Sequence, residues 1–234
     1  MLEAIFHGHS FVEIKTDVLC ILIDPFITWN DACDLSVEDV SKKQIDAVII
    51  THGHEDHIGD TREIVKQTGA QIITSYELGK YFMDEWKIEN VSTHGTWWWV
   101  QYEWFHVKFF QAWHGWGITS FTHGYTTVAA GVIVTVWEKQ IYHAGDTWLT
   151  KDFELLGEYY DIDVAFVPIW DRYTMWPEDA VRAVGMIQPK YVVPIHYNTW
   201  PKIKADDIWF AREVMMANIA TPKILKPWQA VVIT

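Results

Sequence analysis

The sequence predicts an α/β fold in which helices cover the outer faces of β-sheets. Short apolar runs rich in β-branched residues recur along the chain, and segments with helical patterning separate several of them in both halves. No Ser/Gly-rich linker, internal repeat, low-complexity tract or long block of like charges interrupts this alternation. Half of the 234 residues are hydrophobic, so the chain can bury a core, and we expect one domain over residues 1–234.

The predicted strands are short apolar segments, and the N-terminal run Met1–Phe6 already has strand character. Runs with few polar positions are typical of strands that are buried on both faces. The other predicted strands lie near residues 10–14, 18–23, 45–51, 71–74, 107–112, 128–137, 140–143, 162–169, 191–196 and 230–233.

Three predicted helices have recognisable ends. One lies within Gly59–Gly69 and stops at its second glycine. Another opens at Pro177, with acidic residues in its first turn. A last helix is capped by Asp206 or Asp207 and runs through Ala220.

Composition bounds the partners and the compartment. The chain carries 31 acidic and 18 basic side chains, for a net charge of −13, and has no Lys/Arg cluster long enough to follow a phosphate backbone. No apolar run approaches the roughly 20 residues of a membrane-spanning helix, and the N-terminus lacks the features of a secretory signal. Two cysteines build no disulfide framework. We therefore expect a soluble cytoplasmic protein with neither a nucleic-acid nor a membrane partner.

A dense group of potential metal ligands follows the predicted strand at residues 45–51. The six residues from His52 to His57 include the imidazoles of His52, His54 and His57 and the carboxylate of Asp56. Imidazole nitrogen and carboxylate oxygen are ligands that zinc and its first-row neighbours prefer, and a loop can present alternate side chains toward one point. The segment is therefore a candidate metal site at the carboxyl end of a strand, where α/β proteins commonly bind ligands.

The same arrangement of a strand followed by a ligand recurs three more times. His114, Asp146 and His196 each follow a predicted strand. One histidine at a strand end is usually a satisfied core or rim residue. Repetition at several strand ends instead predicts that these side chains gather at one shared site.

These residues resemble the metallo-β-lactamase superfamily, whose H-x-H-x-D-H motif stands here as His52-Gly53-His54-Glu55-Asp56-His57. The likeness extends over almost the whole chain. Within the superfamily, the chain is similar to a small, poorly characterised branch of metal-dependent hydrolases related to the ascorbate-6-phosphate lactonases. It rests on Phe6-His7-Gly8-His9-Ser10, Ile23-Asp24-Pro25-Phe26-Ile27, Tyr142-His143-Ala144-Gly145-Asp146-Thr147, Thr174-Met175 before Pro177-Glu178-Asp179-Ala180, and Pro194-Ile195-His196-Tyr197-Asn198-Thr199. The resemblance implies a four-layer αββα sandwich with metals at one edge between two sheets.

The resemblance also implies a ligand set for two divalent ions. One metal would be held by His52, His54 and His114, the second by Asp56, His57 and His196, and Asp146 would bridge them. Zinc is the expected metal, and manganese, nickel and iron suit the same ligands. Two metals roughly 3.5–4 Å apart can share a hydroxide, because metal binding lowers the pKa of water from about 15.7 toward about 7. Asp56 is also expected to orient that hydroxide.

Three further motif residues have two alternative roles each. His9 is expected either to face the metals or the substrate as a catalytic residue, or to be a rim histidine bonded to backbone. His143 would contact substrate or donate a proton to the leaving group, or be purely structural. Asp24 would orient a histidine ligand, or form a turn before Pro25. His94, His106 and His123 match no motif and are expected in the surface or core.

Fifteen tryptophans in 234 residues exceed ordinary usage. Seven stand where the resembled family usually has glycine: Trp29, Trp97, Trp98, Trp148, Trp170, Trp176 and Trp228. Glycine at such turns commonly supplies a positive φ or close backbone approach, which costs a bulky residue roughly 1–3 kcal/mol per site. We hypothesise that some of these positions are glycine in the native protein. A gene that uses UGA codons for glycine, translated with a code that reads UGA as tryptophan, would produce this pattern. Deliberate redesign is the rival explanation. As native residues they would form core, or an aromatic lid near the metals.

The leading functional hypothesis is a metal-dependent hydrolase that attacks a small ester, lactone, amide or phosphoester with a metal-bridging hydroxide. One alternative is an iron-dependent dioxygenase or redox member of the same superfamily, and another is a metal-stabilised binding module without turnover. The expected partner is a small-molecule substrate, and a homo-oligomer is compatible with the sequence.

Overall fold

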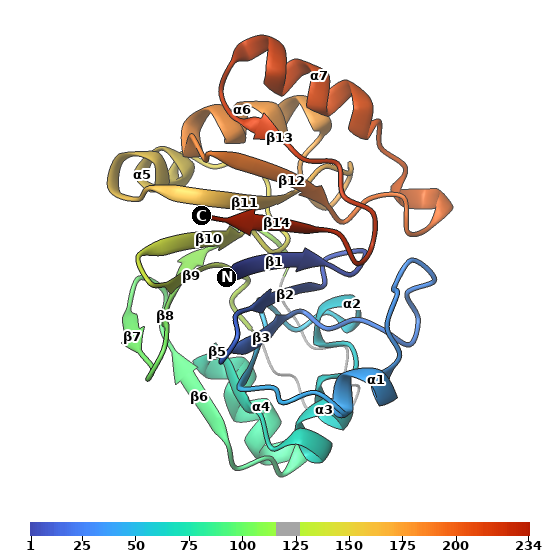
Figure 1. Ribbon diagram of the computed structural model, residues 1–234, viewed down its shortest axis with the longest axis vertical. Helices are drawn as coiled ribbons and strands as arrows, with labels where there is room; N and C mark the ends of the chain where they lie inside the picture. Colours follow the sequence, from blue (N-terminus) through green and yellow to red (C-terminus); the bar gives the residue numbers. More distant parts are fainter. Residues whose placement is uncertain (116–126) are drawn as a thin grey trace.

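Two seven-stranded mixed sheets form the centre of the protein, as shown by a computed structural model that describes residues 1–115 and 127–234 (Figure 1). The first sheet has the strand order β14-β1-β2-β3-β4-β5-β6, and the second has the order β13-β12-β11-β10-β9-β8-β7. The strands of the first sheet are β1 Leu2–Phe6, β2 Val12–Lys15, β3 Cys20–Ile23, β4 Ala47–Ile49, β5 Gln71–Ser75, β6 Val91–His94 and β14 Ala230–Ile233. Those of the second are β7 Trp99–Gln101, β8 His106–Gln111, β9 Ala130–Val136, β10 Lys139–His143, β11 Ile162–Pro168, β12 Tyr191–Ile195 and β13 Thr221–Pro222.

Each sheet combines a parallel and an antiparallel part. Strands β3 to β6 are parallel, as are β10 to β13, and the remaining pairs are antiparallel. The C-terminal strand β14 pairs with β1, which brings the two ends of the chain side by side (Figure 1). The parallel strands of each sheet therefore end at a common edge, where the following loops can meet.

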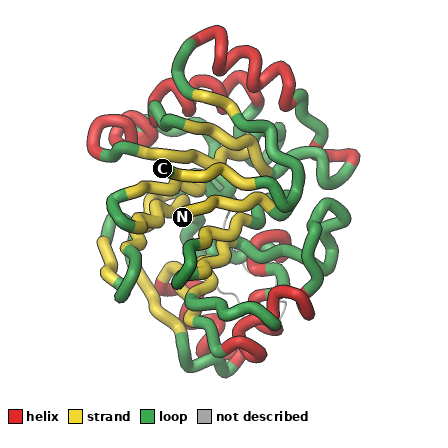
Figure 2. Tube along the Cα trace, viewed as in Figure 1, coloured by secondary structure: helices red, strands yellow, loops and turns green. Residues whose placement is uncertain are grey.

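Alternate residues of the buried strands separate the interior into layers. In β11, Val164 and Phe166 pack between the two sheets, whereas Ala165 and Val167 pack against the outer helices. The helices α1 Val37–Ser41, α2 Glu55–Ile58, α3 Thr61–Thr68 and α4 Tyr76–Trp86 lie on the side of the first sheet, and α5 Asp152–Tyr159, α6 Pro177–Ile187 and α7 Asp207–Ala217 lie on that of the second. Figure 2 shows the helices outside the strands. This order of layers confirms the predicted αββα sandwich.

Every predicted strand is present, and the strands that were not predicted carry weak local signals. β6 has no buried residue, β7 lies at a sheet edge within the run of tryptophans, and β13 has two residues. Strands of this kind are specified by pairing with a neighbour rather than by their own hydrophobic pattern.

The predicted helix ends agree with the structure at three of four caps. α3 stops before Gly69, whose φ is 75°; α6 begins at Pro177; and the Asp206 side chain accepts a hydrogen bond from the Trp209 backbone at the start of α7. The predicted end of the last helix at Ala220 was wrong, because Asn218 adopts a left-handed conformation and the helix ends at Ala217. Among the described residues, no helix has the length and apolar content needed to cross a membrane.

The tryptophans at the expected glycine positions have two kinds of backbone. Trp97 and Trp228 have φ values of 71° and 68°, in the region that favours glycine. None of the other five has a positive φ. Outside the original seven, Trp137 has a φ of 49° in the two-residue loop between β9 and β10, a hairpin position that usually holds Asn or Gly. The conformational argument for glycine therefore applies at Trp97 and Trp228, and extends to Trp137.

Candidate metal centre

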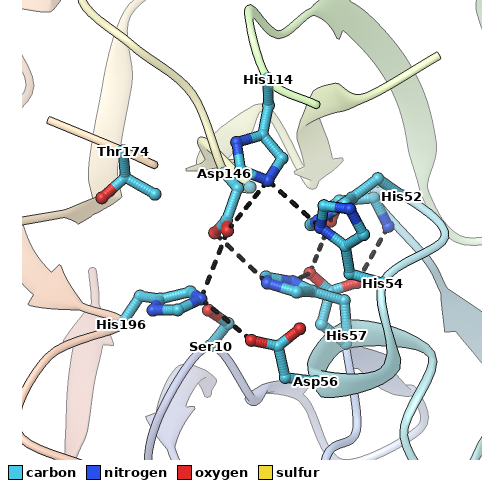
Figure 3. A network of polar contacts seen from close by, with 12 residues as sticks. Ser10, His52, His54, Asp56, His57, His114, Asp146, Thr174 and His196 are labelled. Carbon is cyan, nitrogen blue, oxygen red and sulfur yellow. Dashed lines mark hydrogen bonds and ion pairs between the residues drawn. The ribbon is translucent and has the colours of Figure 1, made fainter. Parts of the chain in front are cut away.

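All seven predicted metal residues lie at the common edge of the two sheets (Figure 3). His52 follows β4, and His196 comes directly after β12. Asp146 follows β10 through Gly145, which has a φ of 59° and leaves no room for a side chain, because a Cβ there would lie 2.7 Å from the Ala130 carbonyl oxygen. The strands thus bring the candidate ligands together at one edge, where the sequence pattern placed them.

The motif His52 to His57 is only partly a loop. His54 is the N-cap of α2, and Asp56 and His57 belong to its single turn. The second half of the expected loop is therefore helical, because the backbone N–H groups of His57 and Ile58 bond the His54 carbonyl and close a helical turn.

Three histidines form the first candidate group. His54 Nδ1 lies 3.0 Å from His52 Nε2 and 3.2 Å from His114 Nε2. His114 Nδ1 donates to the Tyr173 carbonyl oxygen at 2.7 Å, so the neutral ring has a lone pair at Nε2. Unprotonated nitrogens at these separations repel one another unless they share a proton or a cation. The group therefore suits one metal ion with imidazole ligands.

The second group combines carboxylate and imidazole. Ligand atoms of His9, Asp56, His57 and His196 all lie within 4.8 Å of one another. His196 Nε2 is 3.4 Å from Asp56 Oδ2. Burial alone would raise the pKa of Asp56, but the adjacent rings of His196 and His9 hold that pKa below the usual range. Asp56 is therefore an anion at neutral pH, as a metal ligand must be.

The carboxylate of Asp146 lies between the two groups. Its Oδ1 is 3.2 Å from His57 Nε2, and its Oδ2 is 3.3 Å from His196 Nε2 and 3.5 Å from His114 Nε2. Figure 3 shows side chains from several segments converging on this carboxylate. One carboxylate in contact with both groups has the position of a bridging ligand.

The buried polar atoms of this site fit a cation. Among the described residues, His57 Nε2, His196 Nε2 and Asp146 Oδ1 are buried without a hydrogen-bond partner. A buried polar atom without a partner typically costs about 1–3 kcal/mol. Several such atoms directed at one another, all of types that bind transition metals, are explained by ions that accept their lone pairs.

Asp24 orients ligands of both groups. Its Oδ2 accepts hydrogen bonds from His57 Nδ1 and from the Thr51 hydroxyl, each at 2.7 Å. Because the Thr51 hydrogen is used, Thr51 Oγ1 can only accept from His52 Nδ1, 3.0 Å away. Both histidines therefore direct Nε2 inward. This geometry supports the role in orienting a ligand that was one of the two alternatives for Asp24.

We expect Asp24→Asn to lower metal affinity roughly 10–100-fold, because it removes the charge that orients His57 and, through Thr51, His52. Competition with a chromophoric chelator measures the affinity. Asp46→Asn is the matched control, since Asp46 bonds the Cys20 backbone at the opposite end of β3. Equal metal affinity in both variants and the parent would contradict the assigned role.

The sequence model of a protein family, the beta-lactamase superfamily domain, matches residues 20–197, which is most of the chain. The chain belongs to this superfamily. A UPF0173 metal-dependent hydrolase of Bacillus thuringiensis is 42% identical over 237 aligned positions, covering 97% of each chain. Igni18, a metallo hydrolase of the archaeon Ignicoccus hospitalis, is 33% identical with a TM-score of 0.88, covering 98% of this chain and 97% of its own. The resemblance drawn from the motifs is confirmed.

One structural neighbour of the superfamily domain performs different chemistry. CmlA, a diiron β-hydroxylase of Streptomyces venezuelae, has a TM-score of 0.75 and 14% identity, and the match covers 99% of this chain and 54% of CmlA. A likeness at this identity shows a shared fold alone.

The His9 ring contacts the candidate metal centre through the side chains of other residues. Its Nε2 lies 3.2 Å from Asp56 Oδ2, and its Nδ1 lies 2.9 Å from Thr199 Oγ1. Burial, together with the nearby His196, lowers the pKa of His9 to about 3, so the ring is neutral. The Thr199 hydroxyl then donates to Nδ1, and Nε2–H donates to Asp56. These contacts favour a role at the site over a rim histidine bonded to backbone.

His143 has the opposite surroundings. Its Nε2 donates to the Ser10 carbonyl oxygen at 2.8 Å, and its Nδ1 accepts from the Gly145 backbone at 3.1 Å. The side chain is fully buried. Both ring nitrogens are therefore occupied by backbone groups, which favours the structural alternative.

The histidines without motif support do not join the site. His94, at the end of β6, bonds Ser92 and Tyr102, and His106 is exposed in β8. His123 lies outside the described residues.

A cavity of about 960 Å³ opens directly on the candidate metal residues. Its remaining wall includes the aromatic rings of Trp148, Trp170, Tyr173 and Trp200. Trp170 stacks on His196 with ring centroids 5.6 Å apart. Of the seven tryptophans at expected glycine positions, Trp148 and Trp170 line this cavity, whereas Trp176 is not among its lining residues.

Several residues of the site had no distinguishing sequence signal. Thr199, which bonds His9, lies in a matched motif but was given no role. Trp200 and Lys202 follow that motif, and Arg172 lies in the loop after β11. Their positions depend on how the loops after β11 and β12 fold over the sheet edge. Sequence spacing alone does not specify such loop positions.

Proposed function

We propose that this protein is a hydrolase that uses two divalent metal ions, with zinc as the expected metal, to cleave a small-molecule ester, lactone, amide or phosphoester. The carrying observation is the Asp146 carboxylate, which contacts histidines of both candidate groups at the cavity. The 42% identity to a relative named as a metal-dependent hydrolase supports the same reaction class. Iron, manganese and nickel suit the same donors.

The residues of the chain have separate tasks in this proposal. His52, His54 and His114 would hold one ion, Asp56, His57 and His196 the other, with Asp146 shared. Bound ions would supply a hydroxide nucleophile at neutral pH and offset the negative charge that develops during hydrolysis. Asp24 fixes the orientation of His52 and His57. His9 bonds Asp56 through Nε2, while its Nδ1 is held by the Thr199 hydroxyl. Both contacts pre-organise the site before substrate binds.

One experiment separates hydrolysis from the alternatives. Protein loaded with zinc, manganese, nickel or iron is assayed for metal content, oxygen consumption, and hydrolysis of a panel of esters, lactones, amides and phosphoesters. We expect about two ions per chain and hydrolysis without oxygen consumption. Bound iron with oxygen consumption and no hydrolysis would support the dioxygenase alternative. Metal binding without turnover across the panel would support a binding module.

A further inference from the structure

The cavity over the metal centre has an unusual distribution of charge. Among the described residues of its wall, the charged ones are Asp56 and Asp146, which belong to the candidate metal groups, and Arg172 and Lys202. The whole chain, in contrast, has 31 acidic and only 18 basic side chains. Once metal ions offset the two aspartates, the described wall of this cavity is positively charged.

A second cavity, of about 650 Å³, has the opposite character. It adjoins the first, since Asp56 and Trp200 line both. Its described charged lining residues are Glu55, Asp56 and Asp60, all acidic. An anion that reaches the metal centre is therefore directed toward the first cavity and disfavoured in the second.

Arg172 stands on a loop that is bonded to a metal residue. The neighbouring Tyr173 carbonyl accepts the 2.7 Å hydrogen bond from His114 Nδ1. Arg172 itself has a φ of 77°, a left-handed conformation in the turn that follows β11. The position of its backbone is thereby fixed relative to the candidate metal centre.

Lys202 is tied to the other side of the centre. It lies in the short helical turn η1, Pro201–Ile203, which follows β12 and His196. The Ile203 carbonyl accepts from the Asn198 backbone at 2.8 Å, and the adjacent Thr199 hydroxyl bonds His9. Within the described residues, neither Lys202 nor Arg172 has a carboxylate within the 4.0 Å of an ion pair.

We propose that Arg172 and Lys202 bind the anionic group of the substrate, so that the enzyme acts on small molecules carrying a carboxylate or phosphate besides the bond it cleaves. This substrate class rests on the proposed hydrolase function. A guanidinium forms paired hydrogen bonds with either anion, and an ammonium adds a mobile point charge. The aromatic rings of Tyr173 and Trp200 beside them would contact an apolar body.

Equilibrium binding of probes that are not cleaved tests the anion site without turnover. Zinc-loaded protein is titrated calorimetrically with benzoate, phenylphosphonate and neutral benzamide. The variants are Arg172→Gln, Lys202→Gln and their combination; Lys204→Gln is the matched control, because Lys204 is exposed in the same loop but does not line the cavity. Zinc content and melting temperature verify that every variant is folded and loaded.

We expect the double variant to bind at least one of the two anions roughly 10-fold or more weakly, with benzamide binding unchanged. The anion with the larger loss identifies carboxylate or phosphate as the recognised group. Unchanged anion affinity in the double variant, or an equal loss in Lys204→Gln, would overturn the proposal. If anion binding depends on Arg172 and Lys202 but no panel substrate is hydrolysed, the anion site is supported and the hydrolase function is refuted. If substrates are hydrolysed with no preference for anionic ones and the double variant has no effect, the hydrolase function is supported and the anion site is refuted.

Discussion

Asp146→Asn should lower kcat/KM of the metal-loaded protein on the order of 10³-fold or more, because metal ions contribute several kcal/mol of transition-state stabilisation. Its carboxylate is the group that contacts His57, His114 and His196 together. An amide has a similar shape but no charge to offset two cations. The measurements are kcat/KM with the best substrate of the panel and the number of ions bound per chain, which we expect to fall.

Asp163→Asn separates this effect from general destabilisation. Asp163 is also a buried aspartate, but it pairs with Lys190 at 2.7 Å near the beginning of β11, far along the strand from the ligand edge. Its substitution is expected to lower the melting temperature while kcat/KM changes little. If Asp146→Asn kept full activity, or if both variants lost activity equally, Asp146 would not be the shared ligand.

The positions of the candidate ligands were predictable because their signal is local. Each follows a strongly apolar strand, and parallel strands bring their carboxyl ends to one edge. His114 and His196 are distant from the motif of His52 to His57 in sequence, yet this rule places them beside it. The four-layer order came from the resemblance rather than from periodicity, which indicated only helices outside sheets.

Features that depend on contacts between distant segments were not predictable. The pairing of Thr199 with His9 joins loops 190 positions apart, and no pattern in either loop indicates it. The presence of basic residues in the first cavity alone arises in the same way, because Arg172 and Lys202 belong to loops from different strands that both reach this cavity. The roles of His9 and His143 likewise could not be separated by sequence, because each residue matches a motif and only their hydrogen-bond partners distinguish them.

Trp228→Gly should raise the free energy of unfolding by about 1–3 kcal/mol, because it relieves a strained backbone. Residues 226–229 form a turn in which the Gln229 backbone bonds the Lys226 carbonyl at 3.0 Å. Pro227 occupies the second position of this turn and Trp228, with a φ of 68°, the third. That is the pattern of a type II turn, whose third position favours glycine. Chemical denaturation of the parent and the variant measures the change.

Trp29→Gly is the matched control, since Trp29 is 78% exposed and Trp228 is 64% exposed, so little packing is lost at either site. Trp29 does not have a positive φ, and glycine there should lower stability by about 0.4–1 kcal/mol through the greater freedom of the unfolded chain. A gain at position 228 with a loss at position 29 is what backbone strain predicts, whereas equal changes would attribute the effect to removal of an exposed indole. The gain would also support glycine as the native residue at position 228. The coding DNA tests that origin independently, because a UGG codon in a genome with the standard code excludes a misread glycine.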